Sequence, residues 1–158
     1  MRVAIDATCW NNRRGFGRFT RELIQAMAAT RGNRDLLLVA DSATAATPGF
    51  PSNAEICAVP VSRPPIEAAS AESSRTPMDL WRFYRAVARQ RPDAMFFPAV
   101  YSYFPIPRAI PSVVAVHDVI AETHPSLIFA SNRSRRLWNW KLRLALGRSG
   151  RIVTVSEN

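Results

Sequence analysis

Short apolar runs that alternate with segments of helical spacing are the feature that most restricts how this chain can fold. A run that is apolar at every position is typical of a strand buried on both faces of a parallel sheet. Six predominantly apolar segments are candidates for such strands, at residues 2–8, 36–40, 54–61, 94–97, 112–116 and 151–155. Helical spacing or helix-boundary residues predict helices at residues 17–30, 77–91 and 132–148. This alternation predicts an α/β fold, a Rossmann-like open parallel sheet with helices on both faces.

The expected sheet also indicates where a ligand would bind. A length of 158 residues corresponds to one ordinary domain, so we expect a single domain over residues 1–158. Ligands of open parallel sheets bind outside the carboxyl ends of the strands. This rule selects the loop after the first strand, residues 9–18, and the pair His117 and Asp118 after the fifth strand. A neighbouring rim carries the aromatic residues Tyr101 and Tyr103.

Three segments lack the pattern of a regular element. Residues 42–53 contain proline and glycine breakers, and residues 98–111 hold four prolines, which predicts an irregular rim loop. Residues 62–76 are rich in serine, alanine, proline and glutamate and have few large apolar side chains, so we expect a mobile surface loop.

The net charge of +9 comes almost entirely from arginine, because Lys141 is the only lysine. Such an excess is weak evidence for a polyanionic partner, and we do not expect nucleic acid as one. The helix at 133–148 mixes arginine with tryptophan and leucine, but its apolar residues are poorly segregated. A helix that covers the sheet with a solvated arginine face is favoured over peripheral membrane contact, which stays open as the alternative.

The cysteines and the first residues of the chain indicate the cellular compartment in which the protein is expected. Cys9 and Cys57 lack metal-ligand spacing and do not suggest a disulfide scaffold, so we expect no metal site. The start goes directly into a strand pattern, and no apolar run reaches the ~18 residues of a membrane span. We therefore expect a cytoplasmic protein, with the inner membrane face as a possible site of attachment.

A glycine-containing motif, Gly-Phe-Gly-Arg at residues 15–18, lies between the first strand and the first helix. Glycines allow the backbone to approach a ligand, and the amides that begin a helix favour a phosphate. The dinucleotide pattern GxGxxG is incomplete, so a tight turn with solvated arginines remains the alternative. The candidate phosphate-binding residues are Arg13, Arg14, Gly15, Phe16, Gly17 and Arg18.

His117 and Asp118 are the candidate catalytic residues. A neutral imidazole directly after a buried strand can hydrogen-bond a substrate hydroxyl. A structural role, in which His117 is bonded to a neighbouring loop, is an equally good interpretation. Asp6, near the end of the first strand, is interpreted as a buried acceptor that fixes the glycine loop.

Four ordered segments resemble the amino-terminal half of the GT-B glycosyltransferases of family 4. They are VAIDA at 3–7, GFGRFTREL at 15–23, VAVHDVI at 114–120 and IVTVSE at 152–157. The resemblance implies an enzyme of two Rossmann-like domains that transfers a sugar from a nucleotide sugar, usually with retention of configuration. The acceptor would be a glycan such as a polysaccharide end, a lipid-linked glycan or a small molecule.

The same resemblance implies roles for the candidate residues. The glycine loop would face the phosphate and sugar of the donor, His117 would lie beside the transferred sugar, and the rim around Tyr101 would belong to the acceptor side. The leaving diphosphate would help to deprotonate the incoming hydroxyl, so no metal or further cofactor is expected.

The chain departs from the family pattern at its end. The carboxyl-terminal domain of the family, which binds the nucleotide, would follow residue 157, but the sequence ends at Asn158. We therefore expect half of an active site and no turnover by the isolated domain. The alternative is a freestanding nucleotide- or anion-binding module without catalysis.

Overall fold

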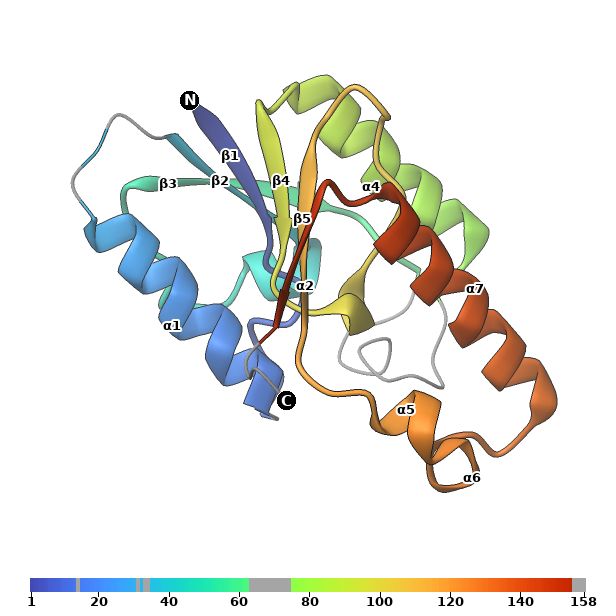
Figure 1. The fold of residues 1–158 in the computed structure, drawn as a ribbon. Coiled ribbons are helices and arrows are strands. Elements are labelled where there is room, and N and C mark those ends of the chain that lie inside the picture. Colours follow the sequence, from blue (N-terminus) through green and yellow to red (C-terminus); the bar gives the residue numbers. More distant parts are fainter. Residues whose placement is uncertain (14, 31, 33–34, 63–74, 155–158) are drawn as a thin grey trace.

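The predicted strands form one open, all-parallel sheet. The computed structural model describes residues 1–13, 15–30, 32, 35–62 and 75–154. Within these residues the strand order is β3-β2-β1-β4-β5-β6 (Figure 1). The strands are β1 (Arg2–Asp6), β2 (Asp35–Asp41), β3 (Ala54–Val59), β4 (Ala94–Phe97), β5 (Ser112–Val116) and β6 (Arg151–Thr154). This order confirms the predicted Rossmann-like α/β fold, with β1 and β4 at its centre.

The helices lie between the strands in the predicted alternation. They are α1 (Gly15–Ala29), α2 (Ser42–Ala45), α4 (Pro77–Gln90), the 3₁₀ helix η1 (Val100–Ser102), α5 (Ile120–Thr123), α6 (Pro125–Ile128) and α7 (Asn132–Arg148). None of these helices is long and apolar enough to cross a membrane.

Successive residues of the central strands point to opposite faces, and each face has its own core. On one face, Ile24 of α1 packs with Val3 and Ile5 of β1. On the other face, Phe83 of α4 and Trp138 of α7 share a core with Ala4. Figure 1 shows α1 on one side of the sheet and α4 with α7 on the other. Helices therefore cover both faces of the central strands, as predicted.

The cover is incomplete at the sheet edges, which corrects the expectation that all six strands are buried. Every residue of β6 is exposed, and Ile152 and Val153 are 51% and 44% exposed. Most of β3 is also accessible. Both strands lie at an edge of the sheet, where a strand has a neighbour on one side only.

Two segments predicted to be irregular contain short helices. The segment 42–53 begins with α2, because the buried Asp41 caps that helix by accepting from the Thr44 amide at 2.9 Å. The proline-rich segment 98–111 contains η1.

The predicted mobile loop at 62–76 falls mainly on residues 63–74, which lie outside the described part of the chain. Its carboxyl end is held in place, which corrects that boundary. Arg75 donates to the Ser102 carbonyl, and Thr76 caps α4 by accepting from the Asp79 amide.

Candidate functional site

The carboxyl edge of the sheet brings the two places selected from the sequence together. The ring of Phe16, in the first turn of α1, stacks on Tyr101 of η1 with centroids 5.4 Å apart. One turn further, Phe19 meets the edge of the His117 imidazole at 4.8 Å. The glycine motif and the His117 loop therefore form one continuous surface, with aromatic rings at the junction.

Gly17 is needed for a reason that the motif does not reveal. A β-carbon at this position would lie 2.1 Å from the Asn12 carbonyl oxygen, whereas one at Gly15 would have no neighbour within 4 Å. Arg21 reinforces the contact by donating to the carbonyls of Trp10 and Asn12, at 2.5 and 3.1 Å. Gly17 thus allows α1 to pack against its own preceding loop, and its role toward a ligand stays a prediction.

The arginines of the candidate phosphate site differ in what the structure describes. The side chains of Arg13 and Arg18 are exposed beside the start of α1, and Arg14 lies outside the described residues. α1 has no acidic residue in its first turn. An anion that approached this helix end would therefore meet no repelling carboxylate from the helix itself.

The structure shows the loop contact that the structural interpretation of His117 predicted, and its catalytic role stays a prediction. Its half-buried ring places Nε2 at 2.7 Å from the Pro98 carbonyl oxygen. A carbonyl only accepts, so Nε2 carries the hydrogen and donates, and in the neutral ring Nδ1 keeps a lone pair. Within the described residues no hydrogen bond to Nδ1 occurs. The contact with Pro98 therefore orients the ring and leaves one nitrogen able to accept from a substrate hydroxyl.

Asp118 connects the His117 loop to the rim. Its Oδ1 accepts from the Tyr101 hydroxyl at 2.9 Å and from the Ile120 amide, at the start of α5, at 3.1 Å. Two bonds to one carboxylate oxygen fix the side chain, which favours a positioning role over proton transfer.

The two predicted rim tyrosines have different environments. Tyr101 is half-buried, with its ring between Phe16 and Trp138. Tyr103 is only 4% exposed and packs against Phe97 in the core, with ring centroids 4.8 Å apart. This corrects the assignment of Tyr103 to an open rim, because its side chain lies in the core together with those of Val100 and Phe104.

Asp6 is buried, as predicted, but its partner differs from the prediction. Its Oδ1 accepts from the amide and hydroxyl of Thr8, at 3.0 and 2.7 Å, and not from the glycine motif. The Thr8 hydroxyl accepts in turn from Arg75 at 2.9 Å. Burial raises the pKa of Asp6, and the nearby positive charge of Arg75 opposes this shift.

Two positively charged residues that contact η1, Arg75 and Lys141, were not among the predicted site residues. Arg75 was assigned to the mobile loop, but its guanidinium lies over the rings of Phe83 and Phe104 and donates to the Ser102 carbonyl at 2.5 Å. Lys141 of α7 donates to the Tyr101 carbonyl. Its status as the only lysine in an arginine-rich chain was the available signal.

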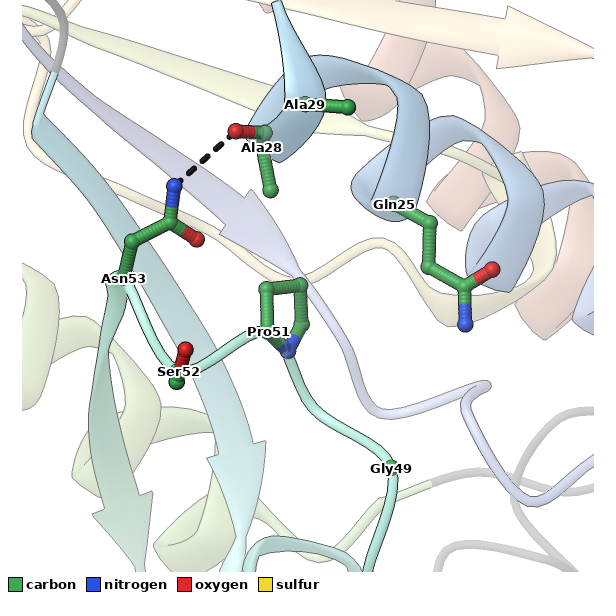
Figure 2. Close-up of a pocket in the computed structure, with 7 residues that line it drawn as sticks. All are labelled: Gln25, Ala28, Ala29, Gly49, Pro51, Ser52 and Asn53. Carbon is green, nitrogen blue, oxygen red and sulfur yellow. Dashed lines mark hydrogen bonds between the residues drawn. The ribbon is translucent and has the colours of Figure 1, made fainter.

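Other parts of the described chain contain fewer groups that could bind a ligand or react with it. Figure 2 shows a pocket of about 510 Å³ between the end of α1 and the segment before β3, where Asn53 donates to the Ala28 carbonyl at 2.9 Å. None of the described residues that line it has an ionisable side chain. Cys9 and Cys57 are free thiols, and burial raises the pKa of Cys9 to about 12. The described residues include no cluster of three or more metal-binding side chains.

An open parallel sheet with a polar and aromatic surface at its carboxyl edge defines a Rossmann-like ligand-binding domain. More specifically, the chain belongs to glycosyltransferase family 4, because the family model described as Glycosyltransferase Family 4 matches residues 13–158. No curated protein matches the sequence. Membership establishes a glycosyltransferase-type domain and implies a sugar donor and an acceptor as its substrates.

Proposed function

We propose that this chain is the acceptor-side domain of a nucleotide-sugar-dependent hexosyltransferase that retains anomeric configuration. The acceptor would be a glycan, a lipid-linked glycan or a small molecule. The observation that supports this proposal best is the contact of Phe16 and Phe19 with Tyr101 and His117. These contacts join the glycine motif and the histidine loop of a family 4 chain into one surface.

The proposed reaction uses the residues of this surface in distinct ways. His117 Nδ1 accepts from a hydroxyl of the transferred sugar, while Nε2 stays on Pro98. The first amides of α1, with Arg13, Arg14 and Arg18, bind the donor phosphates. The leaving diphosphate takes the proton of the incoming acceptor hydroxyl, so the reaction requires no protein base, metal ion or cofactor. A second, donor-binding domain supplies the nucleotide site.

His117 is the residue whose replacement tests this proposal. In the parent enzyme, His117→Ala should lower turnover about 100-fold or more, because a positioned group at the reacting centre contributes on this scale. Folding should be preserved, since the ring is only half-buried. Initial rates with a radiolabelled nucleotide sugar measure the loss, and circular dichroism checks the fold.

The other histidine of the chain provides a matched control. His124 is exposed and bonds to Thr123, so His124→Ala should leave turnover unchanged. Unchanged turnover in His117→Ala would remove this residue from the site. Ordinary enzymatic turnover by the isolated chain would contradict the half-site proposal, and micromolar nucleotide binding by it would favour an anion-binding module instead.

A specific observation also supports peripheral contact with the cytoplasmic face of an anionic membrane. α7 contains no acidic residue and presents exposed Leu137 and Trp140, 48% and 58% accessible, after the exposed Arg133 and Arg136. Leu127 of the neighbouring α6 is 76% exposed. Arginine with exposed tryptophan and leucine is the composition of surfaces that bind anionic lipid.

Vesicle cosedimentation tests this contact. We expect binding to vesicles that contain phosphatidylglycerol, reduced by 0.5 M salt and by Arg133→Ser combined with Arg136→Ser. Uncharged phosphatidylcholine vesicles serve as the control. No binding to anionic vesicles at low salt would exclude the contact.

A further inference from the structure

The carbonyl groups of the last two residues of the 3₁₀ helix η1 accept from side chains. In a continuing 3₁₀ helix, the Ser102 carbonyl would accept from the amide of residue 105, its i+3 partner. Residue 105 is proline, which has no amide hydrogen. The Ser102 carbonyl therefore takes a donor from elsewhere in the protein, and the Tyr101 carbonyl beside it also accepts from a side chain.

Two cations from distant parts of the chain provide those donors. Lys141 Nζ donates to the Tyr101 carbonyl, and Arg75 Nη1 donates to the Ser102 carbonyl at 2.5 Å. Both side chains supply N–H donors at the carboxyl end of the helix, where the outward-pointing carbonyl oxygens accept from a charged or a neutral nitrogen. Lys141 reaches η1 from α7, and Arg75 reaches it from the segment that precedes α4.

The residue held in this way is the centre of the candidate site. The ring of Tyr101 stacks on Trp138 at 5.1 Å and on Phe16 at 5.4 Å, and its hydroxyl donates to Asp118. Lys141 also lies near the Trp138 ring, 5.8 Å from its centroid. A shift of the Tyr101 backbone would therefore change the contact with α1 and the bond to Asp118 together.

We propose that Lys141 is a positioning residue of the candidate site, which with Arg75 caps η1 and so fixes Tyr101 between Phe16 and Asp118. The meaning of this role for an acceptor rests on the proposed function, but its test requires no substrate. In the closed arrangement of η1, Lys141 donates to the Tyr101 carbonyl, and in the open arrangement its amine is released to water. The proposal predicts that the balance between these arrangements depends on the protonation of this single amine.

The sign of that dependence follows from the environment of Lys141. Burial, together with repulsion from Arg75, lowers the pKa of its amine to about 7, while Asp6 and Cys9 oppose the shift. Glu122, bonded to Trp138, and Asp118, bonded to Tyr101, are further acidic groups on the residues that Lys141 contacts. An amine released to water titrates near its ordinary value of about 10.4. Opening of η1 therefore takes up a proton, and linkage makes opening easier at low pH and harder as pH rises from about 7 to 10.

Amide exchange within η1 measures this opening. Ser102 and Tyr103 donate their amides to the carbonyls of Ala99 and Val100. After correction for intrinsic exchange, we expect their protection in the unmodified protein to rise about tenfold between pH 6 and pH 8. Because Lys141 is the only lysine, ¹³C-labelled lysine gives one side-chain signal, which should titrate near pH 7.

Three variants separate positioning from general stability. Lys141→Arg keeps a cationic donor but does not titrate in this range, so η1 should stay protected with no step between pH 6 and pH 8. Lys141→Met removes the donor and should lower protection at pH 8 about tenfold, because the Tyr101 carbonyl loses its partner. Arg143→Met removes an exposed cation from the same helix and should resemble the unmodified protein.

The two Lys141 variants retain Asp6, Cys9, His117 and Glu122, so any pH dependence left in them belongs to groups other than Lys141. A lysine signal that titrates near 10, or the same pH step in Lys141→Arg, would overturn the pH dependence, and unchanged protection in Lys141→Met would overturn the positioning role. If Lys141→Met does not fold, the lysine titration and the arginine variant still decide. If the parent enzyme transfers no sugar from a nucleotide sugar while these exchange results hold, the positioning role stands and the proposed function fails.

Discussion

Replacing Trp138 by alanine should lower the free energy of unfolding by about 3–5 kcal/mol, the range measured for large aromatic residues in protein cores. The indole is 3% exposed and stacks on Tyr101 with ring centroids 5.1 Å apart. Its Nε1 donates to Glu122 at 2.6 Å, so the replacement also removes the link between α7 and α5. Urea denaturation followed by circular dichroism measures the loss.

Trp140 provides the matched control, because it lies two residues away on the same helix and is 58% exposed. Trp140→Ala should change stability by no more than about 0.5 kcal/mol, as is usual for surface substitutions. Equal losses in the two variants would mean that α7 faces the sheet with a different side from that described above.

Substitution of Gly17 by alanine should destabilise the protein by about 3 kcal/mol, the upper part of the usual range for overpacking. The added carbon would lie 2.1 Å from the Asn12 carbonyl oxygen and 2.8 Å from its carbon. These are backbone atoms, so relief requires a shift of α1 or of the preceding loop. Such a shift would also displace Phe16 and Phe19 from Tyr101 and His117.

Gly15→Ala is the control for this variant, since a β-carbon there has no neighbour within 4 Å. Alanine is the better helix former, so this variant should be as stable as the parent or up to about 1 kcal/mol more stable. Denaturation midpoints of both variants, compared with the parent, measure the difference. A stable Gly17→Ala protein would show that α1 does not pack closely on Asn12.

The regular elements were largely predictable because their signals are local. The helix predicted at 132–148 is confirmed as α7, and Ser131 caps it by accepting from the Ser134 amide. Continuous apolar runs predicted the central strands correctly, since burial on both faces leaves no alternation. The exposure of β6 was not predictable, because whether a strand lies at an edge depends on the order in which strands pair.

Prediction of the site was less complete for the same physical reason. The position of His117 at the carboxyl end of a strand followed from the pattern, but its bond to Pro98 depends on how β4 and β5 pair. Tyr101 and Tyr103 look alike in sequence, and the turn of η1 alone separates a rim residue from a core residue. Arg75 and Lys141 escaped notice because each acts on a carbonyl many residues away.

By itself, the sequence determined the alternation of strands and helices, the edge of the sheet where a ligand would bind and the family resemblance. Local spacing and turn residues carry that information. The tertiary structure alone decided which tryptophan of α7 is buried, which glycine is indispensable and which rings meet at the site. Those outcomes depend on contacts between segments far apart in the chain, which no local pattern records.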